Sequence, residues 1–189
     1  MKAIIKNETK VITGRVRLSY ANLFEPKSIQ GSEPKYSVSL IIPKSDKQMV
    51  KAIQEAIENA KERDKAKWNG KVPPALKTPL RDGDEERPED EVYEDSYFLN
   101  ANSKTAPGVV GLEKDAASGK AIKLGEEDVY SGCYARVSVN FYGFNAAGNK
   151  GIACGLGNVQ KIDDGERLGG GASADDEFDF EEAEDDFLG

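Results

Sequence analysis

Histidine is absent from this 189-residue chain, and cysteine occurs only twice. The lack of histidine removes the commonest general base and the commonest transition-metal ligand of proteins. No nucleophile–base pair can be assigned, so the residues predict no catalytic site, no metal site and no cofactor. A Mg²⁺-dependent nuclease that uses carboxylates stays open as an alternative. The acidic run at residues 82–95 does not have the spacing of a calcium-binding loop, so we interpret it as a solvated loop.

Long apolar runs are also missing from the sequence. No stretch approaches the roughly 18 consecutive apolar residues of a membrane span, and the N-terminus lacks the apolar run and cleavage site of a secreted protein. We therefore expect a cytoplasmic protein with no membrane association. Cys133 and Cys154 are too few for a disulfide framework or a structural zinc site, so we expect small buried apolar residues in a reducing compartment.

The formal net charge is −8, but the charges are segregated along the chain. Residues 1–81 hold 17 Lys+Arg against 8 Asp+Glu, which favours a polyanionic partner. Residues 82–95 hold one arginine against nine carboxylates and are expected to form an acidic loop. Residues 172–189 hold nine carboxylates, three phenylalanines and no basic residue. Such a segment cannot offset its ordering entropy by burial, so residues 169–189 are predicted to be a flexible glycine linker and a disordered acidic tail.

Alternation of apolar and polar residues predicts strands over residues 9–20, 35–42 and 133–144. A glycine-rich strand over 151–161 is expected to pair with the last of these as a β-hairpin, and shorter strands are expected at 97–100, 109–112 and 121–124. Helical spacing predicts one good helix from Ser45 to about Trp68, while residues 21–34 and 70–95 are predicted to be loops. Because strands and helices do not alternate, we predict a mainly β fold with one principal helix, built as a small barrel in a single domain over residues 1–168.

The first candidate site for nucleic acid follows the first predicted strand. Arg15 and Arg17 lie on its polar side, and Lys35 begins the next strand; cations of this kind pair with phosphates. The alternative is that the arginines are simply solvated. Nearby Tyr20 and Tyr36 could stack on bases, but both lie on the apolar side of their strands, which favours the alternative that they belong to the core.

The second candidate site is the polar face of the strand at 133–144 together with its hairpin. Two tyrosines that bracket an arginine are typical of a base-stacking platform. The alternative is a face covered by the helix or by the long loop, with the tyrosines packed beneath. The candidate residues here are Tyr134, Arg136, Tyr142, Phe144 and Lys150.

Five blocks of sequence resemble a family of phage and prophage single-stranded DNA-binding proteins. The blocks are RVRLSYANLFEP (15–26), YSVSLIIPKSD (36–46), PLRDGDEERPED (79–90), YFLNANSKTAPGVV (97–110) and the stretch 129–170. The resemblance covers nearly the whole chain. It implies an antiparallel OB-type barrel with long loops, similar in design to the single-stranded DNA-binding proteins of short-tailed phages. It also implies action in phage DNA replication, recombination or repair without catalysis, and an acidic C-terminal tail.

The expected function is sequence-tolerant binding and protection of single-stranded DNA in the cytoplasm of the bacterial host. The tail is expected to compete with DNA for the groove and to recruit replication or recombination proteins. Its partner-binding residues would be Asp175, Asp176, Phe178, Phe180, Asp185, Asp186 and Phe187. A homodimer is compatible with the sequence, which does not determine the oligomeric state. The alternative function is a protein-interaction module whose acidic segments mimic DNA and block a host DNA-binding protein.

Overall fold

The computed structural model describes residues 1–28 and 31–168. Strands dominate this part of the chain, and α1, with 17 residues, is its one long helix. The prediction of a mainly β fold with one principal helix is therefore confirmed. In chain order the elements are β1 (Ile4–Asn7), β2 (Lys10–Ile12), β3 (Val16–Lys27), β4 (Lys35–Pro43), α1 (Lys47–Arg63), η1 (Lys65–Trp68), β5 (Arg81–Asp82), α2 (Gly83–Glu86), η2 (Glu91–Tyr93), β6 (Ser96–Ser103), β7 (Val109–Lys114), β8 (Ala121–Lys123), β9 (Tyr134–Ala146) and β10 (Asn149–Asp163).

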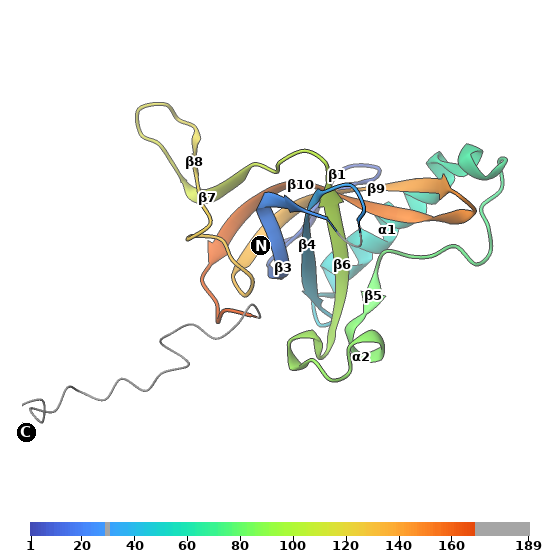
Figure 1. The fold of residues 1–189 in the computed structure, drawn as a ribbon, viewed down its shortest axis with the longest axis horizontal. Coiled ribbons are helices and arrows are strands. Elements are labelled where there is room, and N and C mark those ends of the chain that lie inside the picture. The colour runs from blue at the N-terminus through green and yellow to red at the C-terminus, as the bar shows by residue number, and fades with distance from the viewer. Residues whose placement is uncertain (29–30, 169–189) are drawn as a thin grey trace, which may run out of the picture.

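Five of the strands close into a ring (Figure 1). The ring runs β9–β3–β4–β6–β10 and returns to β9 through the β9–β10 hairpin. Its five strands match the number of strands in an OB barrel. As expected of an antiparallel barrel, four of the five neighbouring pairs in the ring are antiparallel; β6 and β10 pair in parallel at Gly155 and Asn102. A closed ring with an odd number of strands cannot alternate direction at every step, so one neighbouring pair has to be parallel.

The core fills the inside of this ring and is covered by α1. The helix buries Met49, Ile53 and Ile57 in the same cluster as strand residues such as Val137 and Phe141. The helix begins at Lys47, two residues later than expected, because Asp46 accepts a hydrogen bond from the Met49 N–H at 3.1 Å and so caps the first turn.

The predicted strand over residues 9–20 is in fact two strands, β2 and β3, separated at residues 13–15. A Cβ at Gly14 would stand 2.6 Å from the Met1 carbonyl oxygen, so the N-terminal segment passes directly over this break. β3 then continues to Lys27, where a loop was predicted. Pairing of Asn22 with Ser37 and of Lys27 with Lys35 extends the strand past local loop signals.

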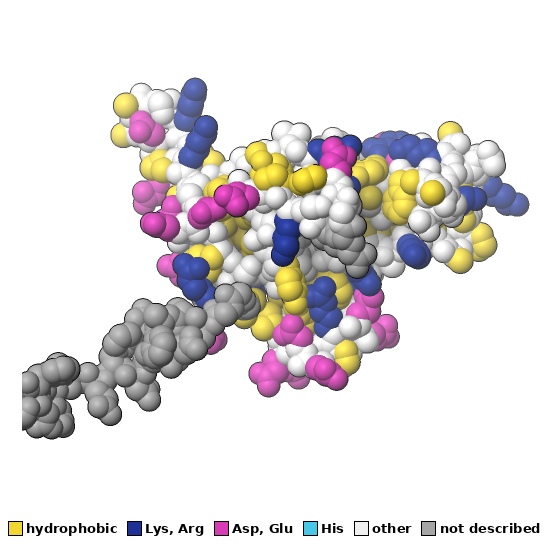
Figure 2. Space-filling model, in the orientation of Figure 1, with side chains coloured by type: hydrophobic (Ala, Val, Ile, Leu, Met, Phe, Trp, Pro, Cys, Tyr) yellow, Lys and Arg dark blue, Asp and Glu magenta, His cyan; other side chains and the backbone are white. Residues whose placement is uncertain are grey.

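The acidic segment 82–95 also differs from the loop that was predicted. It folds into α2 and η2, which are capped by Asp82 and Asp90, and Tyr93 packs edge-on against Phe98 with ring centroids 5.2 Å apart. Lys44 Nζ lies 2.8 Å from Asp82 Oδ1 and 2.7 Å from Asp84 Oδ2. These hydrogen bonds raise the pKa of Lys44 and lower the pKa of both carboxyls. Figure 2 shows the acidic side chains gathered at the bottom of the view, where Figure 1 places α2.

Both cysteines are buried free thiols, as the sequence predicts, and burial raises the pKa of each. Within the described ranges, no helix is long and apolar enough to cross a bilayer. The same residues contain no group of three or more histidine, cysteine or acidic side chains placed to hold a metal ion.

Candidate nucleic-acid interface

A groove crosses the outer face of β3, β4 and β6. Cross-strand pairing places Ser19, Ser39 and Asn100 in one line and Asn22, Ser37 and Asn102 in the next, and paired residues share a face of the sheet. The cavity measures about 620 Å³ and has an acidic residue, Glu33, among its lining residues. We call it the Tyr20 groove; its wall includes Tyr20, Asn22, Lys35, Ser37, Asn100 and Asn102.

Tyr20 stands at the wall of this groove with 63% of its surface exposed. Its φ of 47° lies in the left-handed region, which is unfavourable for a residue with a bulky side chain. The pairing register shifts between Ser19 and Asn22, and this bulge turns the Tyr20 ring away from the core. The result is an exposed aromatic ring in a fixed position, which sequence alternation had assigned to the core.

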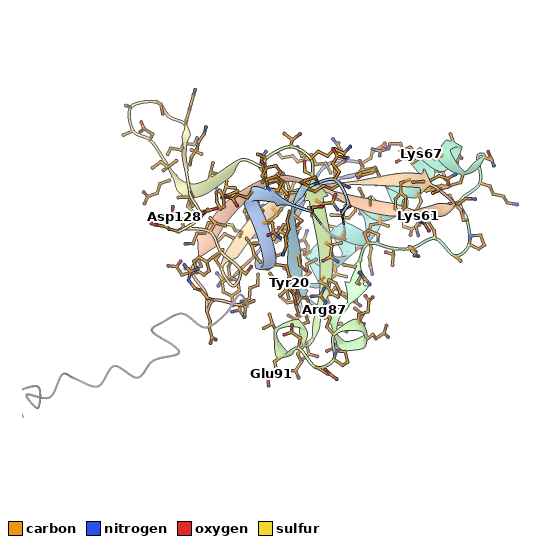
Figure 3. The ribbon with its side chains drawn as sticks, in the orientation of Figure 1. Tyr20, Lys61, Lys67, Arg87, Glu91 and Asp128 are labelled. Carbon is orange, nitrogen blue, oxygen red and sulfur yellow. The ribbon has the colours of Figure 1, made fainter. Side chains whose placement is uncertain are left out.

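Arg87 stacks its guanidinium against three aromatic rings. Its Cζ lies 5.1 Å from the ring centroid of Tyr20, 4.5 Å from that of Tyr93 and 4.6 Å from that of Phe98. Figure 3 shows Arg87 and Tyr20 side by side, one from the acidic segment and one from β3. Its Nη1 is buried and has no hydrogen-bond partner among the described residues. Arg87 therefore braces Tyr20 at the wall of the groove.

Basic side chains make the groove attractive to an anion. Lys27, Lys35 and Lys104 all line it, together with Arg87. Lys104 pairs with Glu33 at 3.0 Å, but that pair is well exposed to solvent, and Lys27 and Lys35 form no ion pair with any described residue. The groove thus combines positive charge, amide and hydroxyl groups, and one exposed ring.

Three of the candidate residues form a separate cluster near the end of the described chain. Arg15 Cζ lies 4.1 Å from the Tyr134 ring centroid, and Arg15 pairs with Asp163 at 3.0 Å. Arg17 donates from Nε to the Gly132 carbonyl at 3.0 Å and from Nη2 to the Glu166 carbonyl at 2.8 Å. These groups already have protein partners that hold residues 163–166 against the barrel. Their contact with DNA stays a prediction.

Arg136 is engaged in a similar way at the other end of the chain. Its Nε donates to the Thr13 carbonyl at 2.9 Å, and its Nη2 donates to the Lys2 carbonyl at 3.0 Å. The side chain thereby ties the N-terminal segment to β9. A role in tracking phosphate stays a prediction for this residue as well.

The remaining hairpin candidates differ from one another in accessibility. Tyr142 is 37% exposed, and Lys67 Nζ lies 5.9 Å from its ring centroid. Phe144 is partly buried, and its ring covers Gly151, where a Cβ would approach it to 2.9 Å. Lys150 is exposed near the hairpin turn. Of the eight candidate residues in the barrel, Lys35 alone lines the Tyr20 groove.

The predicted tail residues Asp175, Asp176, Phe178, Phe180, Asp185, Asp186 and Phe187 lie outside the described residues. The last described residue, Leu168, lines a smaller cavity of about 390 Å³ together with Tyr20 and Ser131. Its N–H donates to the Ser131 carbonyl at 2.9 Å. The chain therefore leaves the barrel beside the Tyr20 groove.

Sequence reasoning favoured the core for Tyr20 and did not consider Arg87, and the reasons differ. Tyr20 continues the apolar alternation of Val16 and Leu18, and the bulge that reverses its direction depends on pairing with β4. Arg87 had a signal that could have been used, because it is the single basic residue within the acidic run 82–95.

Comparison with known proteins adds to this geometry. Residues 9–188 match the family model described as the single-stranded DNA-binding protein of Enterobacter phage Enc34. Protein p50 of Acyrthosiphon pisum secondary endosymbiont phage 1 is 30% identical over 181 residues, which is 90% of this chain and 92% of p50. The single-stranded DNA-binding protein of bacteriophage Enc34, solved in complex with single-stranded DNA, is 28% identical with a TM-score of 0.76, over 89% of this chain and 94% of that chain. The bacteriophage T7 protein gp2.5 shares the fold, with a TM-score of 0.55 at 16% identity over 88% of this chain and 91% of its own.

Proposed function

Because the chain belongs to the Enc34 phage single-stranded DNA-binding protein family, we propose that it binds single-stranded DNA in the Tyr20 groove. The observation that carries this proposal is the exposed Tyr20 ring, which Arg87 holds beside Lys27 and Lys35, two lysines that form no ion pair with a described residue. Aromatic rings stack on any base, so binding of this kind tolerates sequence and needs no catalytic group. The family and the structure of its DNA-bound member support the choice of ligand.

Each part of the groove has a role in this proposal. Lys27, Lys35 and Lys104 neutralise phosphates, and the Tyr20 ring stacks on a base. The amides of Asn100 and Asn102 offer both donors and acceptors to base edges. Duplex DNA keeps its bases stacked inside and cannot use the ring, so we expect preference for the single strand.

The biological setting is also a proposal. The protein would protect single strands during phage DNA replication or recombination in the cytoplasm of the bacterial host. The tail, which follows Leu168 beside the groove, would compete with DNA because it carries nine carboxylates and no basic residue. Its phenylalanines Phe178, Phe180 and Phe187 would recruit replication or recombination proteins, and a homodimer is compatible with this function.

The test is fluorescence anisotropy of a labelled poly-dT strand titrated with the full chain, with a duplex of equal length beside it. We expect tight binding to the single strand, weak binding to the duplex, and a loss of affinity with salt. The slope of log K against log salt concentration should be about −0.7 for each phosphate neutralised. A chain that fails to retain the single strand at low salt does not have this function. Capture of a host DNA-binding protein by such a chain would instead favour DNA mimicry.

A further inference from the structure

Two aromatic side chains within the described part of the chain have more than a third of their surface exposed. They are Tyr20 on β3, at 63%, and Tyr142 on β9, at 37%. The other large hydrophobic residues with comparable exposure are aliphatic and lie near the N-terminus or on the β7–β8 arm, as Met1, Ile4, Leu112 and Ile122 do. The two exposed rings therefore belong to the outer face of the barrel itself.

One row of paired residues joins the neighbourhoods of these two rings. Asn22 pairs with Ser37, Ser37 with Asn102, Asn102 with Gly155, and Gly155 with Asn140, which pairs with Lys10. Paired residues share a face, so all six lie on the outside of the barrel. With neighbouring strands about 4.8 Å apart, the row from Asn22 to Asn140 spans roughly 19 Å of curved surface. We call these six residues the polar row.

The polar row is suited to a DNA strand that lies across it. It contains amides, a hydroxyl, a glycine and a lysine, and no carboxylate. At its centre Gly155 adds no side chain to the surface, and the Tyr142 ring lies beside it: a Cβ at Gly155 would stand 3.5 Å from Tyr142 Cε1. The row therefore leads from Tyr20 directly to the edge of the second exposed ring.

A second cavity of about 660 Å³ lies at the far end of the row. Lys10, Asn140, Gly155 and Gly157 line it, together with Glu8 and Arg63. Arg63 is held by Asp64 and by the Thr9 hydroxyl, which in turn donates to Asn140 Oδ1 at 2.9 Å. Lys10 is thus the cation here that makes no ion pair with a described residue, and it stands next to Asn140 in the row.

We infer that one DNA strand occupies both places: it stacks on Tyr20, crosses the β6–β10 seam over Gly155, and stacks again on Tyr142 beside Lys10. This inference rests on the proposed function and adds to it a second base-stacking site, at Tyr142. Its consequence is a length threshold. A strand too short to reach Tyr142 depends on Tyr20 alone, and a longer strand depends on both rings.

The test measures affinity for oligo-dT over lengths from about 4 to about 16 nucleotides, the range of site sizes for single OB folds. Tyr20→Ala should weaken binding at every length. Tyr142→Ala should change the affinity for the shortest strand by less than about twofold and weaken the affinity for the longest by about 5- to 160-fold, the worth of one base stack. Asn140→Asp keeps the acceptor for the Thr9 hydroxyl and adds a negative charge to the polar row. It should therefore weaken the binding of long strands, and most strongly at low salt.

Gln54→Glu is the matched control for Asn140→Asp. Gln54 is exposed on α1 and lies nine residues before Arg63, roughly two and a half turns, so it is on the opposite side of the helix from the second cavity. It should change affinity by less than twofold at every length. Thermal melting of each variant shows that it is folded.

The outcomes separate the two proposals. If Tyr20→Ala weakens binding and Tyr142→Ala does not change the affinity for strands of any length, then the Tyr20 groove binds DNA and Tyr142 is not a second stacking site. If Tyr142→Ala weakens the binding of strands of all lengths equally, the length threshold is wrong. If wild-type chain retains no strand at any length, the proposed function itself is wrong.

Discussion

Tyr20 adopts a backbone conformation that an L-residue with a large side chain avoids, with φ at 47°. Such strain costs about 1–3 kcal/mol and persists where the surroundings enforce it. Here the shift in register with β4 and the contact with Arg87 enforce it. A strained and exposed ring contributes little to the core, which agrees with the binding role proposed for Tyr20.

The two small substitutions of Tyr20 should separate strain from stacking. Tyr20→Gly and Tyr20→Ala both remove the ring, and both should weaken binding of single-stranded DNA by about 1–3 kcal/mol. Tyr20→Ala keeps a Cβ at positive φ, so we expect it to unfold about 1 kcal/mol more easily than Tyr20→Gly. Urea unfolding and anisotropy on the same preparations check both. Equal stabilities of the two variants would contradict the strain, and unchanged affinity would remove Tyr20 from the site.

At the scale of elements, one carboxylate joins α1, η1 and β9. Asp64 follows the last residue of α1, and its oxygens accept from Arg63 Nε at 3.0 Å, from Arg63 Nη2 at 2.9 Å and from the Gly143 N–H at 2.7 Å. Gly143 is required here, because a Cβ would stand 2.7 Å from the Trp68 ring and 2.9 Å from Asp64 Cβ. This junction ends the long helix five residues before the Trp68 limit that periodicity predicts.

The hydrogen bonds from Arg63 and Gly143 lower the pKa of Asp64 from 3.8 to about 2. A depressed pKa in the folded state means that the ionised form stabilises the fold above pH 4, and that this contribution is lost as the pH falls towards about 2. Asp64→Asn should therefore lower the free energy of unfolding by about 1–2 kcal/mol at pH 7 and by much less at about pH 2. Urea unfolding of both proteins at the two pH values measures the difference. A difference in the free energy of unfolding between the two proteins that does not change with pH would show that the ion pair is not its source.

At the scale of the whole molecule, charge is separated between the barrel and its acidic segments. One acidic segment, 82–95, is neutralised in part by Lys44 and packs on β6 through Tyr93 and Phe98. The other, 172–189, follows Leu168 at the edge of the Tyr20 groove. The 21 residues after Leu168 can span roughly 70 Å when extended, which is ample to reach across the groove.

Removal of Ala172–Gly189 should tighten binding of single-stranded DNA, most clearly at low salt, because a competing polyanion is lost. A chain of full length in which the nine tail carboxylates become Asn or Gln is the matched control, and it should bind as tightly as the truncated chain. Anisotropy at two salt concentrations compares the three. Affinity that stays the same or falls on truncation would show that the tail does not compete with DNA.

Much of the fold could be predicted from local pattern. The alternation in β9 gave its buried face, and the hairpin with β10 is confirmed, with positive φ at Ala147 and Gly148 as a tight two-residue turn requires. The length of β3 and the folding of 82–95 could not be predicted. Both depend on partners far along the chain: Ser37 and Lys35 for β3, and Phe98 for Tyr93.

Local pattern was enough to predict the fold class, the helix, the hairpin and the segregation of charge, because periodicity and composition are local properties of the chain. The direction in which each side chain points, and the partners it has, depend instead on contacts between distant parts of the chain. A bulge turned Tyr20 outward, backbone carbonyls engaged Arg17 and Arg136, and register placed Asn102 beside Gly155. Those outcomes depend on pairing between distant strands, and a one-residue shift in register reverses the face of every side chain that follows.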